Sequence, residues 1–380
     1  MKATGMKNYP KWLLGTVTVV LTVTVCLALA EVALRFLPVA SAMYTRPVTA
    51  ENRVFHFGPN RDFVYSRDWD MVLANRGHVN NAGFVNDQDY QKSGSLPLLA
   101  VVGDSMIEAA MVPHQDTLQG RLSVALAGKL RVYSFAASGA PLSQYLIWAQ
   151  HAVREYGAQA LVITVVSNDF DESHSAYQAT PGFWHYVPDT NGTLQLRLFE
   201  YRPGQLRDVV VASALARYLL FNMQVGVHWI ELKSWLFGRL TMAASRDAVT
   251  STVDVGDKRV RDSLAVVDAF FRDLPHYADL PASRILFVVD GFRYPHKVQA
   301  GVFFDRMRRV LLEKATSLGY DAIDLDPIFF DRHSRTGERF EFARDGHWSA
   351  IGHGAAFHAV MASRFMQRLL SAPSRGAEGR

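Results

Sequence analysis

The chain has 380 residues, of which 49% are hydrophobic and 20% are charged, a globular composition with a slight apolar excess. Its 40 basic and 36 acidic residues give a net charge of +4, without any block of lysine and arginine, which excludes a nucleic-acid reader. The single cysteine, Cys26, excludes a disulfide within the chain and a zinc site built from several cysteines.

The first feature along the chain is an apolar segment near the N-terminus. Lys2, Lys7 and Lys11 precede residues 12–30, an uncharged stretch long enough to cross a bilayer as a helix. Because lysines tend to stay on the cytoplasmic side, this arrangement predicts that the rest of the chain is exported. The segment at 1–42 is therefore expected to be a membrane anchor or an export signal.

A cleaved signal peptide is the alternative to an anchor. Residues 28–30 and 40–42 both have the Ala-x-Ala pattern of a cleavage site, whereas no lipoprotein motif surrounds Cys26. The length of the apolar run, and its resumption at residues 32–34, favour an anchor that stays attached. The domain beyond it is then expected on the extracytoplasmic, periplasmic side, with cleavage and secretion as the alternative.

Strands and helices alternate after a polar, irregular lead-in at residues 43–95. Short apolar runs predict buried strands, and longer periodic segments predict helices between them. This alternation favours right-handed βαβ crossovers in one parallel sheet. The predicted strands lie at residues 96–102, 131–135, 161–166, 285–289 and 321–325, and the helices at 118–130, 142–156, 302–318 and 349–370.

An insertion at about residues 171–255 interrupts this pattern within a domain predicted to span 96–380. Apolar runs at 183–187 and 194–199 flank an Asn-Gly turn signal at 191–192, which predicts a β-hairpin. Residues 208–232 then predict one long apolar helix. Trp229 and Trp235 near this helix would suit a membrane interface or a protein core.

Polar residues follow three of the predicted strands at the edge where a parallel sheet binds its ligands. Ser105 comes after the first strand, on a turn that begins with Gly103 and enters a helix. Gly139 follows the second strand and would let a substrate approach the backbone, and Asn168 follows the third with an amide to donate. The N–H groups of Ser105 and Gly139 and the Asn168 amide would together make an oxyanion hole.

A serine nucleophile needs a base, and the base needs an acid that orients it. Asp345 and His347 lie two residues apart just before the last predicted helix, so in an extended turn both project to the same side. The structural alternative is that Asp345 caps that helix and His347 is a surface residue. His353 and His358 on the helix are expected to be packing or surface residues.

These blocks resemble the SGNH (GDSL-like) hydrolase superfamily, over roughly residues 96–170 and 285–370. The resemblance implies a three-layer α/β/α, flavodoxin-like core with a parallel sheet. It also implies Ser105 as nucleophile, His347 as base and then acid, and Asp345 as its orienting partner. Val166 departs from the family, which usually has glycine there, and the Asp-x-His-Trp spacing is shorter than usual and looks like that of alginate O-acetyltransferase-type relatives.

The leading hypothesis is a serine ester hydrolase that acts outside the cytoplasm on an O-acylated carbohydrate or lipid. An O-acetyltransferase that modifies an envelope or exported polysaccharide is the first alternative. A catalytically silent envelope protein that binds polysaccharide is the second. No cofactor is expected, and no metal site is expected because the histidines lack ligand spacing.

Overall fold

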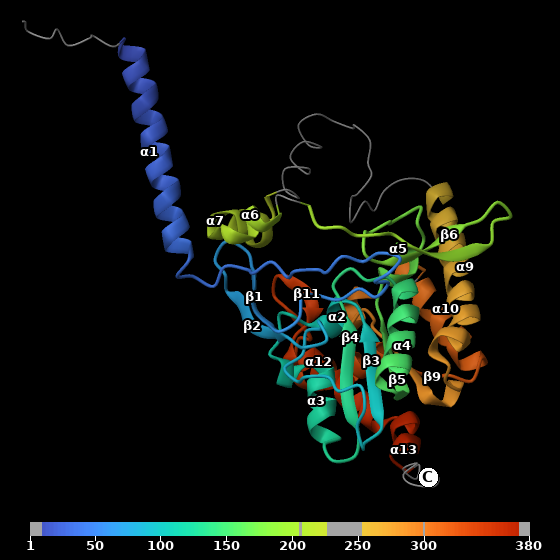
Figure 1. Cartoon of the computed structure of the whole chain (residues 1–380). Helices are drawn as coiled ribbons and strands as arrows, with labels where there is room; N and C mark the ends of the chain where they lie inside the picture. Colours follow the sequence, from blue (N-terminus) through green and yellow to red (C-terminus); the bar gives the residue numbers. More distant parts are fainter. Residues whose placement is uncertain (1–9, 205–206, 226–252, 299–300, 372–380) are drawn as a thin grey trace, which may run out of the picture. The chain divides into compact units, whose positions relative to one another are not determined.

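The computed structural model describes residues 10–204, 207–225, 253–298 and 301–371 (Figure 1). Two compact units make up the chain. We call Met1–Ala42, Phe63–Ala74 and Gly204–Met242 the anchor unit, and Met43–Asp62, Asn75–Pro203 and Ala243–Arg380 the sheet unit. Lys2, Lys7, Trp229 and Trp235, which entered the sequence predictions, lie outside the described residues.

A five-stranded parallel sheet forms the centre of the sheet unit. Its spatial order is β4-β3-β5-β8-β9, in which the first of the five strands along the chain lies second from the edge. This is the order of flavodoxin-like folds, and it confirms the predicted α/β class. The strands are β3 (Leu98–Gly103), β4 (Arg131–Ala136), β5 (Ala158–Val165), β8 (Ile285–Val289) and β9 (Asp321–Asp324).

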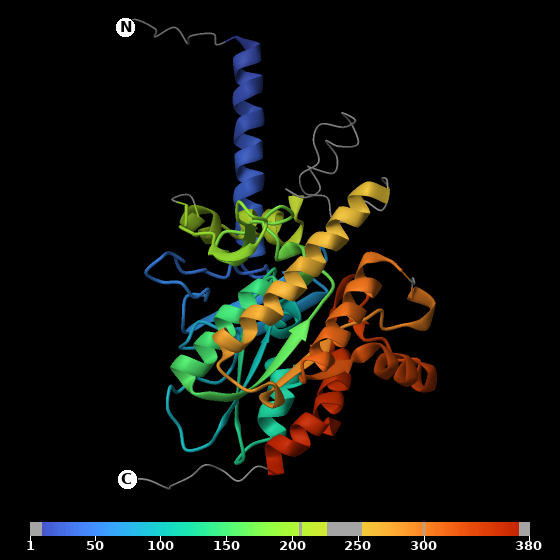
Figure 2. The same ribbon diagram turned by 90° about the vertical axis from the view of Figure 1, so that its right-hand side faces the viewer.

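Helices cover both faces of this sheet, so the inner strands are buried on both sides. Leu286 and Val288 of β8 point to one face, where they join an apolar core with α3, α11, α12 and α13. Phe287 points to the other face and packs against Phe270 and Phe271 of α9. Figure 2 shows α4 and α9 lying across this second face. The helices are α3 (Leu118–Ala125), α4 (Leu142–Tyr156), α9 (Val253–Ala278), α10 (Phe303–Ser317), α11 (Leu325–Thr336), α12 (Ala350–Ala362) and α13 (Arg364–Ser371).

The hairpin predicted around the Asn-Gly signal is present as β6 (Trp184–Pro188) and β7 (Leu194–Leu198). The Asp189 carboxylate accepts the N–H groups of Asn191 and Thr193, both within 2.9 Å, which closes the turn. Smaller elements complete the fold: β1 (Arg61–Arg67), β2 (Leu73–Val79), α2 (Ser105–Glu108), η1 (His114–Asp116), α5 (Asp169–Glu172), η3 (Ala282–Arg284), η4 (Pro295–Lys297), β10 (Glu341–Phe342) and β11 (Asp345–Trp348).

Three sequence predictions of secondary structure were wrong. The lead-in is not wholly irregular, because β1 and β2 pair there. The helix predicted at 349–370 is two helices, since Ser363 has an extended backbone with ψ 152°. The helix predicted at 208–232 is also broken, by an extended Ser213, into α6 (Arg207–Ala212), α7 (Ala214–Arg217) and the π-helical turn η2 (Tyr218–Asn222). Its predicted part from residue 226 onward lies outside the described residues.

In the anchor unit, α1 (Lys11–Leu34) is the apolar N-terminal helix expected from the sequence. It has 24 residues, and its most apolar 18-residue window has a mean hydropathy of 2.4 and no buried residue. By length and composition it suits a membrane anchor or a signal sequence. Near its C-terminal end the Glu31 carboxylate accepts hydrogen bonds from the start of α7.

Candidate active site

Strand register brings the predicted site residues to one edge of the sheet. Gly103 at the end of β3 pairs with Ala136 of β4, and Val102 pairs with Ile163 of β5. On the other side of β5, Val165 pairs with Val289 of β8. The segments that follow these four strands therefore begin side by side, as the carboxyl ends of parallel strands do.

Ser105 begins α2 immediately after the turn that leaves β3. Asp104 caps this turn by accepting the Met106 N–H at 2.9 Å, and the Ser105 hydroxyl donates to the other Asp104 oxygen at 3.2 Å. Gly103 is required here, because a Cβ at that position would lie 2.5 Å from Cγ1 of Ile107. The helix expected behind Ser105 is only four residues long, so its dipole offers less to an anion than a full helix would.

Asp345 and His347 lie on β11, and the structure places them in direct contact. One Asp345 oxygen accepts both the backbone N–H of His347, at 3.0 Å, and the ring Nδ1. The Asp345 side chain is fully buried, whereas that of His347 is 25% exposed. Asp345 therefore orients the imidazole, and the alternative in which it caps the last helix is wrong, because the residue at that cap is Ser349.

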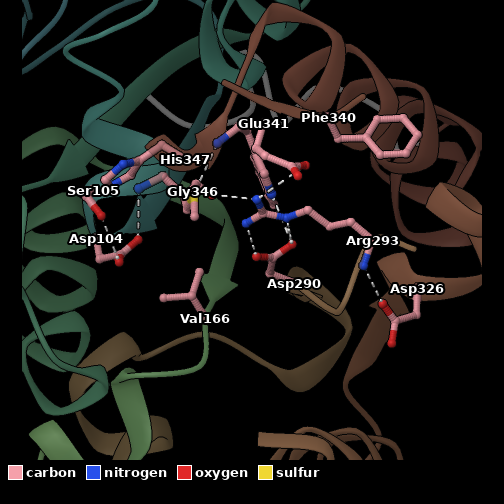
Figure 3. Close-up of polar contacts among 12 residues, drawn as sticks. Asp104, Ser105, Val166, Asp290, Arg293, Asp326, Phe340, Glu341, Gly346 and His347 are labelled. Atoms are coloured by element: carbon pink, nitrogen blue, oxygen red, sulfur yellow. Dashed lines mark hydrogen bonds and ion pairs between the residues drawn. The ribbon is translucent and has the colours of Figure 1, made fainter. Parts of the chain in front are cut away.

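The strand that carries His347 packs against the turn that carries Ser105. The N–H of Trp348 lies 3.4 Å from Sδ of Met106, so the neighbours of His347 and Ser105 touch. In Figure 3 the imidazole of His347 lies beside the Ser105 side chain, with Asp104 beneath both. Burial raises the pKa of Asp104, while the Met106 N–H and the nearby His347 act in the opposite direction.

The two further oxyanion-hole candidates differ in how they are held. Gly139 has φ +77° and open space where a side chain would start, which suits a close approach of substrate. Asn168 donates its amide to Glu172 at 2.9 Å, so one of its two amide hydrogens is already bonded. Its turn is fixed by buried Asp169, which accepts the Val166 N–H at 2.7 Å.

Glu108, at the end of α2, is a buried carboxyl that the sequence analysis missed. It accepts the backbone N–H of Ser138, the residue before Gly139, and its Oε1 has no partner within the described residues. Burial raises the pKa of Glu108 from 4.5 to about 7, although the bonds from Ser138 and the nearby His347 lower it. Glu108 thus ties the turn after β4 to the helix that Ser105 begins.

Arg293 and Asp290, which follow β8, form a second group that the sequence analysis missed; we call it the Arg293–Asp290 clasp. Both are nearly buried, and Arg293 binds both Asp290 oxygens, at 2.6 and 3.3 Å. Arg293 also donates to the carbonyl of Gly346, and Asp290 accepts the indole N–H of Trp348 at 3.0 Å. The clasp therefore holds β11 on both sides of His347. Figure 3 shows the bond from Arg293 to Gly346.

The other two histidines near the last block, His353 and His358, form no hydrogen bond with Ser105, His347 or the clasp among the described residues. His353 is fully buried and accepts the Leu118 N–H through Nδ1 at 3.1 Å, and burial lowers its pKa to about 3. His358 is exposed on α12. Both fit the predicted packing and surface roles.

No protein-family model matches the chain, and no curated protein is similar to it. Solved structures that are similar include three hydrolases. An α/β hydrolase from a Lake Arreo metagenome is 13% identical with a TM-score of 0.39, over 74% of this chain and 99% of that one. A GDSL-family lipolytic protein from Veillonella parvula is 10% identical with a TM-score of 0.34, over 70% and 96%. The acetyl xylan esterase Axe2 from Geobacillus stearothermophilus is 10% identical with a TM-score of 0.36, over 74% and 97%.

These similar structures include the GDSL class of hydrolase that the sequence motifs resemble. With identities of 10–13% and TM-scores below 0.4, the likeness says nothing about the activity or the substrate of this chain.

Proposed function

We propose that this chain is a membrane-anchored serine ester hydrolase whose catalytic residues are Ser105, His347 and Asp345. The observation that carries the proposal is the double contact of Asp345 with His347 on a strand that packs against the Ser105 turn. A buried carboxylate bonded to Nδ1 leaves Nε2 of the same ring for a hydroxyl. A surface histidine would have no need of such a partner.

In the first half-reaction the Ser105 hydroxyl attacks the ester carbonyl and gives its proton to His347. Asp345 stabilises the imidazolium that forms. The N–H groups of Ser105 and Gly139 and the free amide hydrogen of Asn168 would bind the developing oxyanion. His347 then protonates the leaving alcohol, and in the second half a water molecule, deprotonated by His347, releases the acid and restores Ser105.

Before it attacks, the Ser105 hydroxyl has to turn away from Asp104, to which it donates in the substrate-free protein. Such a rotation about one staggered side-chain bond is a small change. The bond to Asp104 is long at 3.2 Å, so it is readily exchanged for a bond to His347 when substrate enters.

The anchor supports an extracytoplasmic site of action. Glu31 of α1 accepts hydrogen bonds from Ser213, Ala214 and Leu215 at 2.8–3.1 Å, so the end of α1 is part of the folded anchor unit. Cleavage after residue 42 would remove these contacts, which supports the anchor over cleavage at that site, whereas cleavage after residue 30 would leave Glu31 in the chain. With its lysines on the cytoplasmic side, the sheet unit would meet acyl groups on carbohydrate or lipid outside the cytoplasm.

A fluorophosphonate probe and p-nitrophenyl acetate test the proposal on the full chain in detergent. The wild type should be labelled and should hydrolyse the ester. Ser105→Ala should not be labelled and should lose about 10³-fold or more in turnover. Ser334→Ala is a matched control, because this serine is exposed on α11, where its hydroxyl donates to the Asp331 carbonyl. Equal labelling of wild type and Ser105→Ala would remove Ser105 from the mechanism.

The short Asp-x-His-Trp block keeps an O-acetyltransferase as the second candidate. The same acyl-enzyme would then pass its acetyl group to a sugar hydroxyl instead of to water. A polysaccharide acceptor that gains acetyl groups in the presence of an acetyl donor distinguishes transfer from hydrolysis. Absence of probe labelling in a folded wild type would favour the silent polysaccharide-binding protein.

A further inference from the structure

The segment α7–η2 of the anchor unit uses its polar groups to bind the rest of that unit. Besides the bonds to Glu31, Asn222 donates to Ser66 at 2.8 Å and accepts the Ala40 N–H at 3.0 Å. Arg217 donates to the Ala40 carbonyl, and the Tyr218 hydroxyl donates to the Trp69 carbonyl, both at 3.0 Å. The segment is thus fixed to the end of α1 and to the turn between β1 and β2.

Large apolar side chains of the same unit are left exposed. Phe36, just after α1, is 85% exposed, and Val72 and Trp69 in the β1–β2 turn are 81% and 67% exposed. Three consecutive residues of η2 add to them. Hydrogen bonds join the segments that carry these side chains, from Arg217 to Ala40 and from Tyr218 to Trp69. Exposed apolar side chains on neighbouring segments are rare in a soluble monomer, so a partner is expected to cover them. We call this set the anchor-foot surface: Phe36, Trp69, Val72, Leu219, Leu220 and Phe221.

The position of Glu31 indicates which partner that is. Glu31 accepts hydrogen bonds from Ser213, Ala214 and Leu215, at the start of α7. Because a carboxylate is costly in hydrocarbon, we place the membrane boundary between Glu31 and the apolar run at 12–30. That run spans about 28 Å at about 1.5 Å per residue, close to the roughly 30 Å of a hydrocarbon core. With α1 inserted, α7 therefore lies at the level where the headgroups begin.

We infer that the anchor-foot surface lies in the interfacial layer of the bilayer that α1 crosses, on its extracytoplasmic side. Trp69 and Phe36 are side chains of the kind that membrane interfaces hold. An amphipathic segment with its apolar side on the membrane and its polar groups turned inward is the arrangement of monotopic anchors. Arg35, paired with Glu31 and largely exposed, adds a cation for lipid phosphates. The inference rests on the proposed anchorage and not on the hydrolase chemistry.

The bilayer is favoured over a second copy of the chain because α1 already brings it to this surface. No separate encounter is needed, and both the helix and the surface belong to one unit, joined by the hydrogen bonds of Glu31 and Asn222. Depth-dependent quenching separates the two, since a label covered by protein shifts its emission but is shielded from quenchers on lipid chains.

The test uses the full chain in liposomes with an environment-sensitive fluorophore on one cysteine at a time. Wild type is labelled at Cys26 in α1 and reports the anchor. Phe221→Cys and Trp69→Cys, each with Cys26→Ser, report the surface, and Leu220→Cys replaces either variant if it fails to fold. Val124→Cys and Leu318→Cys, also with Cys26→Ser, are controls, because both residues are exposed and apolar but belong to the sheet unit.

The inference expects labels at 221 and 69 to shift to shorter wavelength and to be quenched by lipids brominated near the headgroup. Labels at 124 and 318 should do neither. Quenching at Cys26 without quenching at 221 and 69 would contradict the placement of the anchor-foot surface in the bilayer, but would keep α1 as a membrane anchor. Shifted but unquenched labels at 221 and 69 would indicate a protein partner and contradict that placement as well. An unquenched Cys26 would remove the anchor and the inference together, without bearing on Ser105.

Discussion

The buried carboxyl of Glu108 makes a sharp prediction about how stability depends on pH. Burial raises its pKa from 4.5 to about 7 in the folded chain, so between these values the folded state holds a proton that the unfolded state has lost. The contribution of Glu108 to stability is therefore complete below pH 4.5 and is lost as pH rises through 7. Glu108→Gln removes this titration, so the free energy of unfolding of the variant, relative to that of the wild type, should increase with pH.

The size of the effect follows from the pKa change. One pKa unit corresponds to about 1.4 kcal/mol, so the change from 4.5 to about 7 corresponds to about 3 kcal/mol. Any cost of burying the glutamine amide is the same at every pH and cancels. Asp104 and Asp169, whose pKa values burial also raises, are present in both proteins and largely cancel as well.

Denaturant titration of the full chain in detergent at pH 4.5 and pH 8, followed by tryptophan fluorescence, measures the difference. The free energy of unfolding of Glu108→Gln minus that of wild type should be larger at pH 8 by about 3 kcal/mol. Glu313→Gln, on the exposed face of α10, controls for the loss of one acidic side chain. A difference for Glu108→Gln that does not change between the two pH values would refute the reasoning.

Three further predictions concern the site. Arg293→Lys should lower kcat about 100-fold with little change in KM, because Lys cannot bind Asp290 and the Gly346 carbonyl together and β11 shifts. Esterase kinetics measure both constants, and a lowered KM with normal kcat would contradict the prediction. Asn168→Ala should lower kcat about 100-fold by removing one oxyanion donor, while an unchanged rate would leave the oxyanion to the backbone alone. Gly139→Ala should destabilise the fold by about 1 kcal/mol, because φ is +77°, and should also reduce turnover although the added methyl group meets open space. Denaturation measures the first effect and ester hydrolysis the second. A variant as stable and active as wild type would show that Gly139 takes no part in the site.

Much of the sheet was predictable because four of its strands are almost wholly buried and appear in sequence as short, mainly apolar runs. The predicted strands match β3, β4, β5, β8 and β9 within a few residues, although β9 is only partly buried. Helix breaks were not predictable from periodicity, which continues across Ser213 and Ser363 although the backbone there is extended. The pairing of β1 with β2 was missed because their apolar residues are few: β1 has only the three at 63–65, and β2 is mostly polar.

The site was predictable where a residue type directly follows a strand and chemistry gives that type a role. Ser105, Gly139 and Asn168 were identified in this way. The same rule applied to the strand at 285–289 points to Asp290, which was passed over because no reaction step called for it. Glu108 left less of a signal, since only the fold reveals that a glutamate three residues after Ser105 turns inward to Ser138.

The short spacing of Asp345 and His347 and the Arg293–Asp290 clasp explain each other. Two side chains two residues apart share a face only while the backbone between them is extended. Here the middle residue is Gly346, which has no side chain to hold it in that conformation, and its carbonyl is instead fixed by Arg293. Trp348, on the opposite face, is held by Asp290 and buried in the core. A longer Asp–His spacing could form its contact across a turn, whereas this spacing depends on the strand, and hence on two residues that follow β8.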